Sequence, residues 1–191
     1  MSATSEYNRL VESRIDHVRR LRRARIVAIL TLILIVLFYV FLAYELRGQA
    51  QESACDASLW QHVYKPQRLT VHEPCVTVTG TLADATRGRR KDGVRKEADG
   101  DTHGWLKVDP GFEYLLNVGN LSNEDGNLVF EVVCRYPVKQ ADAKAACRGY
   151  ASDVVLPPVG SHVAVTGSWV MDDNHAHWNE IHPVTKIEVI Q

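Results

Sequence analysis

The stretch LTVHEPCVTVTGTLAD, residues 69–84, decides the fold class of this chain. Its second half alternates apolar and polar residues, with Val76, Val78 and Leu82 on one side and threonines on the other. A period of two with β-branched residues predicts a β-strand that is buried on one face. Gly80 interrupts the pattern, as expected where a strand bends at the corner of a small barrel.

Four further runs have the same strand-like character. They are HGWLKVD at 103–109, NLVFEVVC at 127–134, SHVAVTGSWVM at 161–171, with Gly167 at a second bend, and HPVTKIEVI at 182–190. Between the third and fourth runs, residues 139–150 are rich in helix formers. This order of five strands and one helix is that of an OB-fold, a small Greek-key barrel. We therefore predict a mainly β, five-stranded OB-fold-like barrel with one helix between strands three and four. Another small barrel or sandwich is the alternative.

An uninterrupted apolar run, IVAILTLILIVLFYVFLAY, occupies residues 26–44 and contains no charged side chain. A helix needs about 20 apolar residues to cross the hydrocarbon core of a bilayer, so this run is long enough. A cleaved signal peptide is the rival interpretation, but its apolar stretch is normally about 7–15 residues and ends at a small-residue cleavage site. The following residues contain no clear site of that kind. We therefore predict a retained single-pass anchor.

The charges beside the apolar run predict its orientation. Residues 1–25 carry seven arginines and three acids, and positively charged flanks stay in the cytoplasm. Apolar residues at helical spacing between positions 10 and 21 favour an amphipathic segment whose arginines contact anionic membrane lipid. The predicted organisation is a cytoplasmic segment 1–25, a transmembrane helix 26–44, a linker 45–54 and an extracytoplasmic domain 55–191, periplasmic or at the cell surface.

All four cysteines follow the apolar run, at Cys55, Cys75, Cys134 and Cys147. An even number in a domain outside the cytoplasm predicts two disulfides, formed in an oxidising compartment. Three pairings are possible, and we favour the local ones, Cys55–Cys75 and Cys134–Cys147. Each closes a loop whose cross-link contributes about 3 kcal/mol in the chain-entropy model. A zinc site on the cysteines is disfavoured because no C-x-x-C spacing occurs.

The ligand surface of an OB-fold is the outer face of strands two and three, with the loops between strands one and two and between strands four and five. In this chain the first loop is basic, and the second is DDNHAHWNEIHPV, residues 172–184. On strand two, Leu106 and Val108 are expected in the core, which turns the alternate residues outward. The candidate ligand-binding residues are Arg87, Arg89, Arg90, Lys91, Arg95, Lys96, Trp105, Lys107 and Trp178. A solvated, mobile loop is the alternative for the basic run.

Histidines and acids gather in the loop between strands four and five. His175 and His177 are two residues apart, so in an extended chain they point the same way, and Glu180 and His182 share that spacing. Together with Asp101 and His103 they supply enough donors for a divalent metal such as zinc. The candidate metal ligands are His103, His175, His177, Glu180 and His182.

Such a metal can activate water for phosphodiester hydrolysis, and without metal a histidine and an acid can act as general acid and base. The candidate catalytic residues are Asp101, His103 and Glu180. The alternative is structural, in which His182 bonds loop carbonyls and Trp178 packs over the barrel end.

The pieces EPCVTVTGTL, DGDTHGWLKVD, VGSHVAVTGSWVMD and WNEIHPVTKI resemble a group of bacterial OB-fold domains of unassigned function. The resemblance covers about residues 68–191, and it implies the fold but no activity. The run DGDT, which contains Asp101, is also similar to the calcium-binding segment of staphylococcal nuclease-like OB barrels. That second similarity implies a nuclease as an alternative function.

The sequence supports three hypotheses about function. The first is a membrane-anchored binding module for an anionic or carbohydrate polymer, or for a partner protein of the cell envelope. The second is a metal-dependent phosphodiesterase or nuclease, and the third is a structural subunit of a membrane complex. The formal charge of −1 does not favour general nucleic-acid binding. We favour the binding module.

Overall fold

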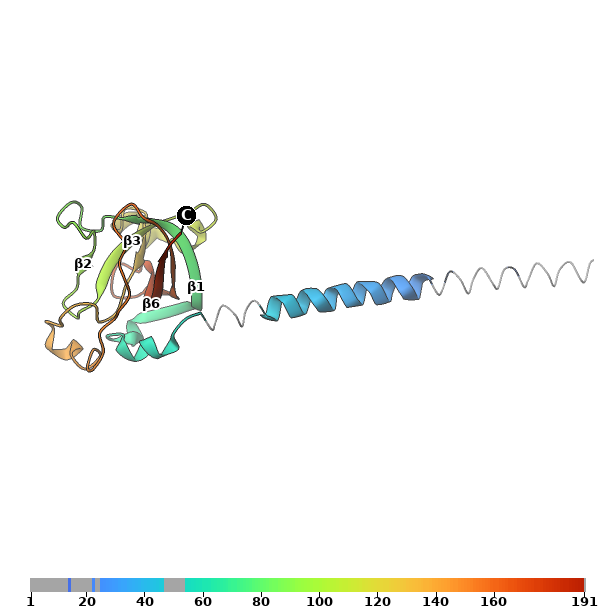
Figure 1. Ribbon diagram of the computed structural model, residues 1–191, viewed down its shortest axis with the longest axis horizontal. Coiled ribbons are helices and arrows are strands. Elements are labelled where there is room, and N and C mark those ends of the chain that lie inside the picture. Colours follow the sequence, from blue (N-terminus) through green and yellow to red (C-terminus); the bar gives the residue numbers. More distant parts are fainter. Residues whose placement is uncertain (1–13, 15–21, 23–24, 47–53, 191) are drawn as a thin grey trace, which may run out of the picture. The chain divides into compact units, whose positions relative to one another are not determined.

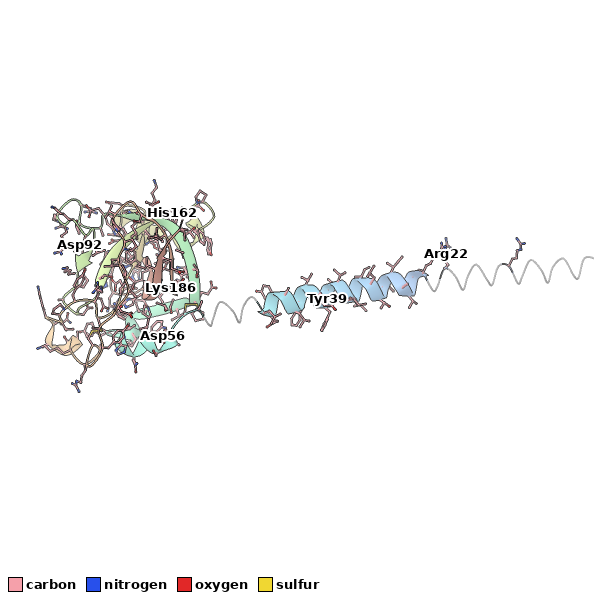
Figure 2. All side chains as sticks on the ribbon, in the orientation of Figure 1. Arg22, Tyr39, Asp56, Asp92, His162 and Lys186 are labelled. Carbon is pink, nitrogen blue, oxygen red and sulfur yellow. A yellow bond between two sulfur atoms is a disulfide. The ribbon has the colours of Figure 1, made fainter. Side chains whose placement is uncertain are left out.

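The computed structural model describes Arg14, Arg22, residues 25–46 and residues 54–190. The chain forms two compact units, residues 1–49 and 50–191. The first unit contains the helix Arg25–Leu46, which has 22 residues and is apolar enough to cross a membrane. Its side chains are exposed on every side, as Figure 2 shows around Tyr39. This helix is a candidate membrane anchor. The predicted amphipathic segment 10–21 lies, apart from Arg14, outside the described residues.

The second unit is a closed β-barrel (Figure 1). Its strands are β1 Leu69–Ala83, β2 Arg95–Lys96, β3 Thr102–Val108, β4 Leu128–Phe130, β5 His162–Asp172 and β6 Asn179–Val189. They follow the order β1-β5-β6-β4-β3-β2, and pairing of β1 with β3 closes the barrel. Neighbours are antiparallel except β4 and β6, which are parallel. Five of these strands were predicted and the two-residue β2 was not. The predicted mainly β, OB-fold-like class is confirmed.

Two predicted elements are shorter in the structure. The run 127–134 pairs as a strand only over β4, and the chain turns further on at Cys134, whose φ is 52°. The helix predicted over 139–150 is reduced to a 3₁₀ turn, Ala141–Ala143. A short helix is marginal unless packing supports it, and here a disulfide from Cys147 to Cys134 ties down the segment. The described α-helix of the domain, α2 Val118–Asn123, instead lies between β3 and β4.

The barrel core is mainly aliphatic, together with Phe130, and draws residues from each of the five longer strands. Its fully buried members include Val78, Leu106, Leu128, Val163, Val165 and Ile181. Gly80 and Gly167 lie where strands approach closely, as their positions in the sequence predicted. A Cβ on Gly80 would lie 2.4 Å from the Lys107 carbonyl oxygen, and one on Gly167 would lie 2.4 Å from that of Pro183. The barrel therefore needs glycine at both bends.

The segment before β1 packs against the barrel. Leu59 of the 3₁₀ helix Ala57–His62 and Val63 after it pack in a second apolar cluster with Val170 of β5. A second 3₁₀ helix, Pro66–Arg68, leads into β1. The His62 ring stacks on Tyr150, with centroids 4.0 Å apart, and the Tyr64 hydroxyl donates to Asp142 at 2.5 Å. The disulfides are Cys55–Cys75 and Cys134–Cys147, which confirms the favoured pairing. These contacts hold residues 64–68 beside the barrel wall.

Candidate functional site

A pocket of about 590 Å³ lies between three connecting segments on the outside of the barrel. Residues 95–99 precede β3, residues 174–178 join β5 to β6, and residues 64–68 precede β1. The pocket is lined by Tyr64, Lys65, Arg68, Arg95, Glu97, Ala98, Asp99, His103, Glu131, Gln140, Asn174, His175 and Trp178. The structure therefore brings part of the basic loop and part of the histidine-rich loop to one site, on the surface that OB-folds use for ligands.

Trp178 forms an aromatic wall of this pocket. The His175 ring stacks on it, with centroids 5.4 Å apart, and the His103 ring meets it edge-on at 5.5 Å. The indole N–H of Trp178 donates to Glu180 at 2.9 Å, which fixes the orientation of the ring. The stacked rings of His175 and Trp178 therefore form one aromatic wall next to the hydrogen-bonding groups of the pocket.

Behind the pocket wall lies a cluster of ionisable side chains that are almost fully buried. It contains five carboxyl groups, one arginine and two histidines, each at most 8 % exposed: Asp101, Glu124, Glu131, Asp172, Glu180, Arg68, His103 and His182. Removing a single charge from water costs several kcal/mol, so buried charges persist only when they are paired. We refer to these eight residues as the buried charge cluster.

Carboxylates and imidazoles alternate along the cluster. His182 Nδ1 lies 2.9 Å from Glu180 Oε1 and 3.0 Å from Glu131 Oε2. On the other side of Glu131, Oε1 lies 3.4 Å from His103 Nδ1, and His103 Nε2 lies 2.8 Å from Glu124 Oε2. Each histidine is thus held by two carboxylates. Arg95 continues the series to the pocket, because its guanidinium contacts both His103 and Glu124.

The two histidines are basic despite their burial. Burial by itself disfavours the charged imidazole, but the hydrogen bonds that His103 donates to Glu124 and Glu131 raise its pKa to about 9. In the same way, burial is outweighed at His182, where the charges and hydrogen bonds of Glu131 and Glu180 raise the pKa to about 10. Both imidazoles are therefore protonated on both nitrogens, and positively charged, at neutral pH.

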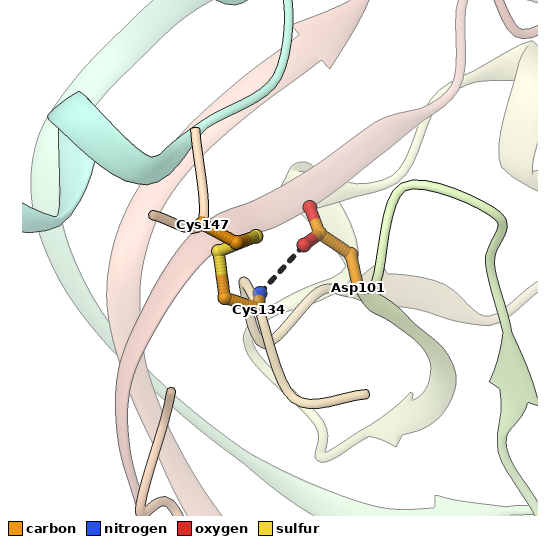
Figure 3. A group of neighbouring side chains, drawn as sticks. All are labelled: Asp101, Cys134 and Cys147. Carbon is orange, nitrogen blue, oxygen red and sulfur yellow. Dashed lines mark hydrogen bonds between the residues drawn. A yellow bond between two sulfur atoms is a disulfide. The ribbon is translucent and has the colours of Figure 1, made fainter. Parts of the chain in front are cut away.

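The pKa values of the Glu131 and Asp101 carboxyl groups shift in opposite directions. Burial raises the pKa of Glu131, but His182 and His103 outweigh it and hold that pKa well below its usual range. At Asp101 burial dominates and raises the pKa to about 7, although the charge of His182 opposes it. One Asp101 oxygen accepts a hydrogen bond of 2.7 Å from the Cys134 backbone N–H, and the other points away from the disulfide (Figure 3).

Arg68 anchors the opposite side of the cluster. Its guanidinium pairs with Asp172 and lies 3.8 Å from Glu131 and 4.0 Å from Glu180.

Sequence reasoning missed Arg68, Glu124, Glu131 and Asp172. A signal existed for Glu131, which interrupts the apolar run VFEVV. The other three stand in polar surroundings in the sequence, so no local pattern distinguishes them.

Two residues of β3, the second of the predicted strands, are buried although they were expected to be exposed. His103 and Trp105 lie on the face of β3 away from the core residue Leu106, as predicted, but they are only 2 % and 4 % exposed. The indole of Trp105 donates to Glu124 at 2.5 Å, and the Arg87 guanidinium covers its ring at 5.5 Å. The expectation of a stacking surface at Trp105 is therefore wrong, because loops and α2 cover that face. Lys107 is exposed.

Acids neutralise much of the basic loop. Arg87 pairs with Asp125 at 3.1 Å, and Arg90 pairs with Asp92 at 2.8 Å. Lys96 lies 4.0 Å from Asp92 and 4.2 Å from the centre of the Tyr136 ring. Arg89 donates to a backbone carbonyl of its own loop, and Lys91 is exposed. Of the seven basic residues predicted to bind, six in this loop and Lys107, Arg95 alone lines the pocket.

The predicted metal set does not assemble at one point. His175 and His177 do not share a direction, because the chain turns there with φ of 53° at Ala176 and 55° at His177. His175 Nδ1 lies 2.8 Å from Asp172, whereas His177 is exposed and lies 3.5 Å from Asp173. The expectation that the two histidines act as a pair is therefore wrong. His103, Glu180 and His182 are in the buried charge cluster instead.

Two groups of potential ligands lie close together among the described residues. One consists of Asp101 with Cys134 and Cys147, but these sulfurs form a disulfide and offer no thiolate. The other consists of Asp101, Glu131 and His182, with one donor atom from each within 4.8 Å of the others.

Comparisons with protein-family models, curated proteins and solved structures found no match. The resemblance to bacterial OB-fold domains therefore stays a prediction, and function has to be inferred from the geometry of the site.

Proposed function

We propose that this protein is a membrane-anchored, extracytoplasmic binding module whose OB-like barrel takes a carbohydrate chain in the pocket beside Trp178. The observation that carries this proposal is the composition of that pocket. An aromatic wall stands beside carboxylate, guanidinium and amide groups, on the surface that OB-folds use for ligands. A sugar ring presents an apolar face for such a wall and hydroxyl groups for such polar side chains.

The charges favour a carbohydrate over a polyanion. The pocket is lined by three lysine or arginine residues and three aspartate or glutamate residues. The basic groups have acidic partners, since Lys65 lies 3.7 Å from Asp142 and Arg95 lies 3.3 Å from Glu124. A polyanion would have to compete with these carboxylates. A hydroxyl group donates to a carboxylate and accepts from a guanidinium, so it uses both signs of charge.

The test measures binding of short oligosaccharides of glucose, galactose and N-acetylglucosamine to the full chain in detergent, with polyphosphate and single-stranded DNA as polyanionic probes. Tryptophan fluorescence and calorimetry report binding. We expect an oligosaccharide to bind with little dependence on salt, because few ions are released. Polyphosphate or DNA binding that weakens steeply with salt, without any sugar binding, would contradict the proposal.

Two neighbouring histidines supply a matched pair of variants. His175 stacks on Trp178 in the pocket, whereas His177 is similarly exposed and lies outside it. We expect His175→Ala to weaken oligosaccharide binding by about 2- to 12-fold, the equivalent of about 0.5–1.5 kcal/mol for one stacking contact. His177→Ala should bind as the wild type does. Equal effects of the two variants would place the sugar elsewhere.

The metal-dependent phosphodiesterase is a second candidate, favoured by the proximity of Asp101, Glu131 and His182. Of these three residues only Glu131 lines the pocket, and both nitrogens of His103 already contact carboxylates. The same protein preparation should therefore not hydrolyse bis(p-nitrophenyl) phosphate in the presence of Zn²⁺. Turnover that Asp101→Asn abolishes would favour the enzyme.

A further inference from the structure

Two polar atoms in the buried charge cluster face each other without a hydrogen bond. Asp101 Oδ2 and His182 Nε2 lie 3.7 Å apart, and neither has a hydrogen-bond partner among the described residues. Both side chains are at most 2 % exposed. Leaving a buried polar atom unsatisfied costs about 1–3 kcal/mol, so two adjacent ones call for an explanation.

The spacing of these two atoms matches a shared cation better than the other common arrangements. A direct hydrogen bond would bring them to about 2.7–3.2 Å, and a bridging water would separate them by about 4.5 Å. Two ligands of one tetrahedral zinc, with bonds of about 2.0–2.2 Å, lie about 3.4 Å apart. The observed separation of 3.7 Å is closest to the last value.

The environment of His182 also directs Nε2 toward a metal. Its other nitrogen, Nδ1, lies 2.9 Å from Glu180 Oε1, so Nδ1 carries the proton that the carboxylate accepts. Once Nε2 has lost its proton to an incoming metal, an imidazole held in this way by a carboxylate presents the Nε2 lone pair, which is the usual arrangement of a metal-binding histidine. Glu180 thereby fixes the ring that Asp101 faces.

Glu131 supplies a third ligand and a route of entry. One of its carboxylate oxygens lies within 4.8 Å of the donor atoms of Asp101 and His182, and the residue also lines the pocket. The cluster contains five carboxyl groups against one arginine and two histidines. A divalent cation therefore offsets the excess of carboxyl groups in the cluster.

We propose that Asp101, Glu131 and His182 form a divalent transition-metal site, with zinc as its test ion, buried behind the part of the pocket wall that Glu131 forms. The one-nitrogen, two-oxygen donor set suits zinc, which also accepts a water or a ligand group in its fourth position. This site differs from the surface histidines His175 and His177. It does not depend on which ligand the pocket binds.

The experiment adds Zn²⁺ alone to the full chain in detergent, with disulfides intact, after a chelator has been dialysed away. We expect one bound zinc per chain and an increase in thermal stability, because the ion binds the folded state. Asp101→Asn should lower zinc affinity at least about 100-fold, since it removes a ligand and not only a supporting group. The double variant His175→Ala, His177→Ala should bind zinc as the wild type does.

X-ray absorption at the zinc edge of the wild type keeps the test valid if Asp101→Asn does not fold. We expect one imidazole nitrogen and otherwise oxygen donors. Absence of zinc binding by the wild type would overturn the proposal, as would a spectrum with two imidazoles. Loss of zinc in the His175→Ala, His177→Ala variant would overturn it as well.

Discussion

His103 and His182 are each held by two carboxylates in the interior of the domain, and this couples the stability of the fold to pH. In the unfolded chain both have a pKa near 6.5, whereas in the fold the values rise to about 9 and about 10. A raised pKa means that the charged form stabilises the fold. That contribution is complete below about pH 6.5 and is lost as the pH rises through the folded values.

The metal-free protein should therefore lose stability between about pH 7 and 10. Within this window each of the two histidines lowers the free energy of unfolding by up to about 1.4 kcal/mol per pH unit. Urea unfolding with a chelator present, followed by tryptophan fluorescence, measures the slope. His103→Gln should reduce the slope by about half, because one of the two protons is no longer bound. A free energy of unfolding that stays constant from pH 7 to 10 would contradict this account.

At the scale of the element, strands β1 and β5 bend where a side chain would not fit. A Cβ on Gly167 would lie 2.4 Å from the Pro183 carbonyl oxygen and 2.6 Å from Ile181. The register between β5 and β6 also shifts on both sides of Gly167. The neighbouring strand therefore passes too close for any residue larger than glycine.

Replacing Gly167 with alanine should destabilise the barrel by about 1–3 kcal/mol, because β6 must move away. Local preference predicts the opposite sign, since glycine inside a strand costs about 0.5–1 kcal/mol relative to alanine. The free energy of unfolding from urea denaturation distinguishes these two expectations. Lys186→Ala on the exposed side of β6 is the control and should change stability by less than about 0.5 kcal/mol. If Gly167→Ala stabilises the protein, the bend does not require glycine.

For the whole molecule, the arginines of residues 1–25 and the helix Arg25–Leu46 predict that the barrel lies outside the cytoplasm. The disulfides Cys55–Cys75 and Cys134–Cys147 agree with an oxidising compartment. An alkaline phosphatase fused after Gln191 should therefore be active in a bacterial host, because that enzyme needs an oxidising space. The cysteines should resist thiol alkylation until they are reduced. An inactive fusion with freely alkylated cysteines would indicate the opposite orientation, with the barrel in the cytoplasm.

Local patterns in the sequence determined the strands, the apolar helix and the disulfide pairing. Each depends on residues close together in the chain, such as the alternation from Val76 to Leu82 or the run 26–44. The position of the pocket also followed from the strand order, because an OB-fold places the loops before β3 and before β6 on one face. Burial was predicted less well, since it depends on which loops cover a strand. Trp105 is buried for that reason.

Only the tertiary structure determined which residues form the buried charge cluster. Arg68 precedes β1, His103 lies in β3, Glu131 follows β4 and His182 lies in β6, so their contacts join segments far apart in the chain. They meet because β4 pairs with β6 and because the segment before β1 packs on the barrel. A charge becomes buried and paired only when distant segments close around it, and no local pattern carries that information.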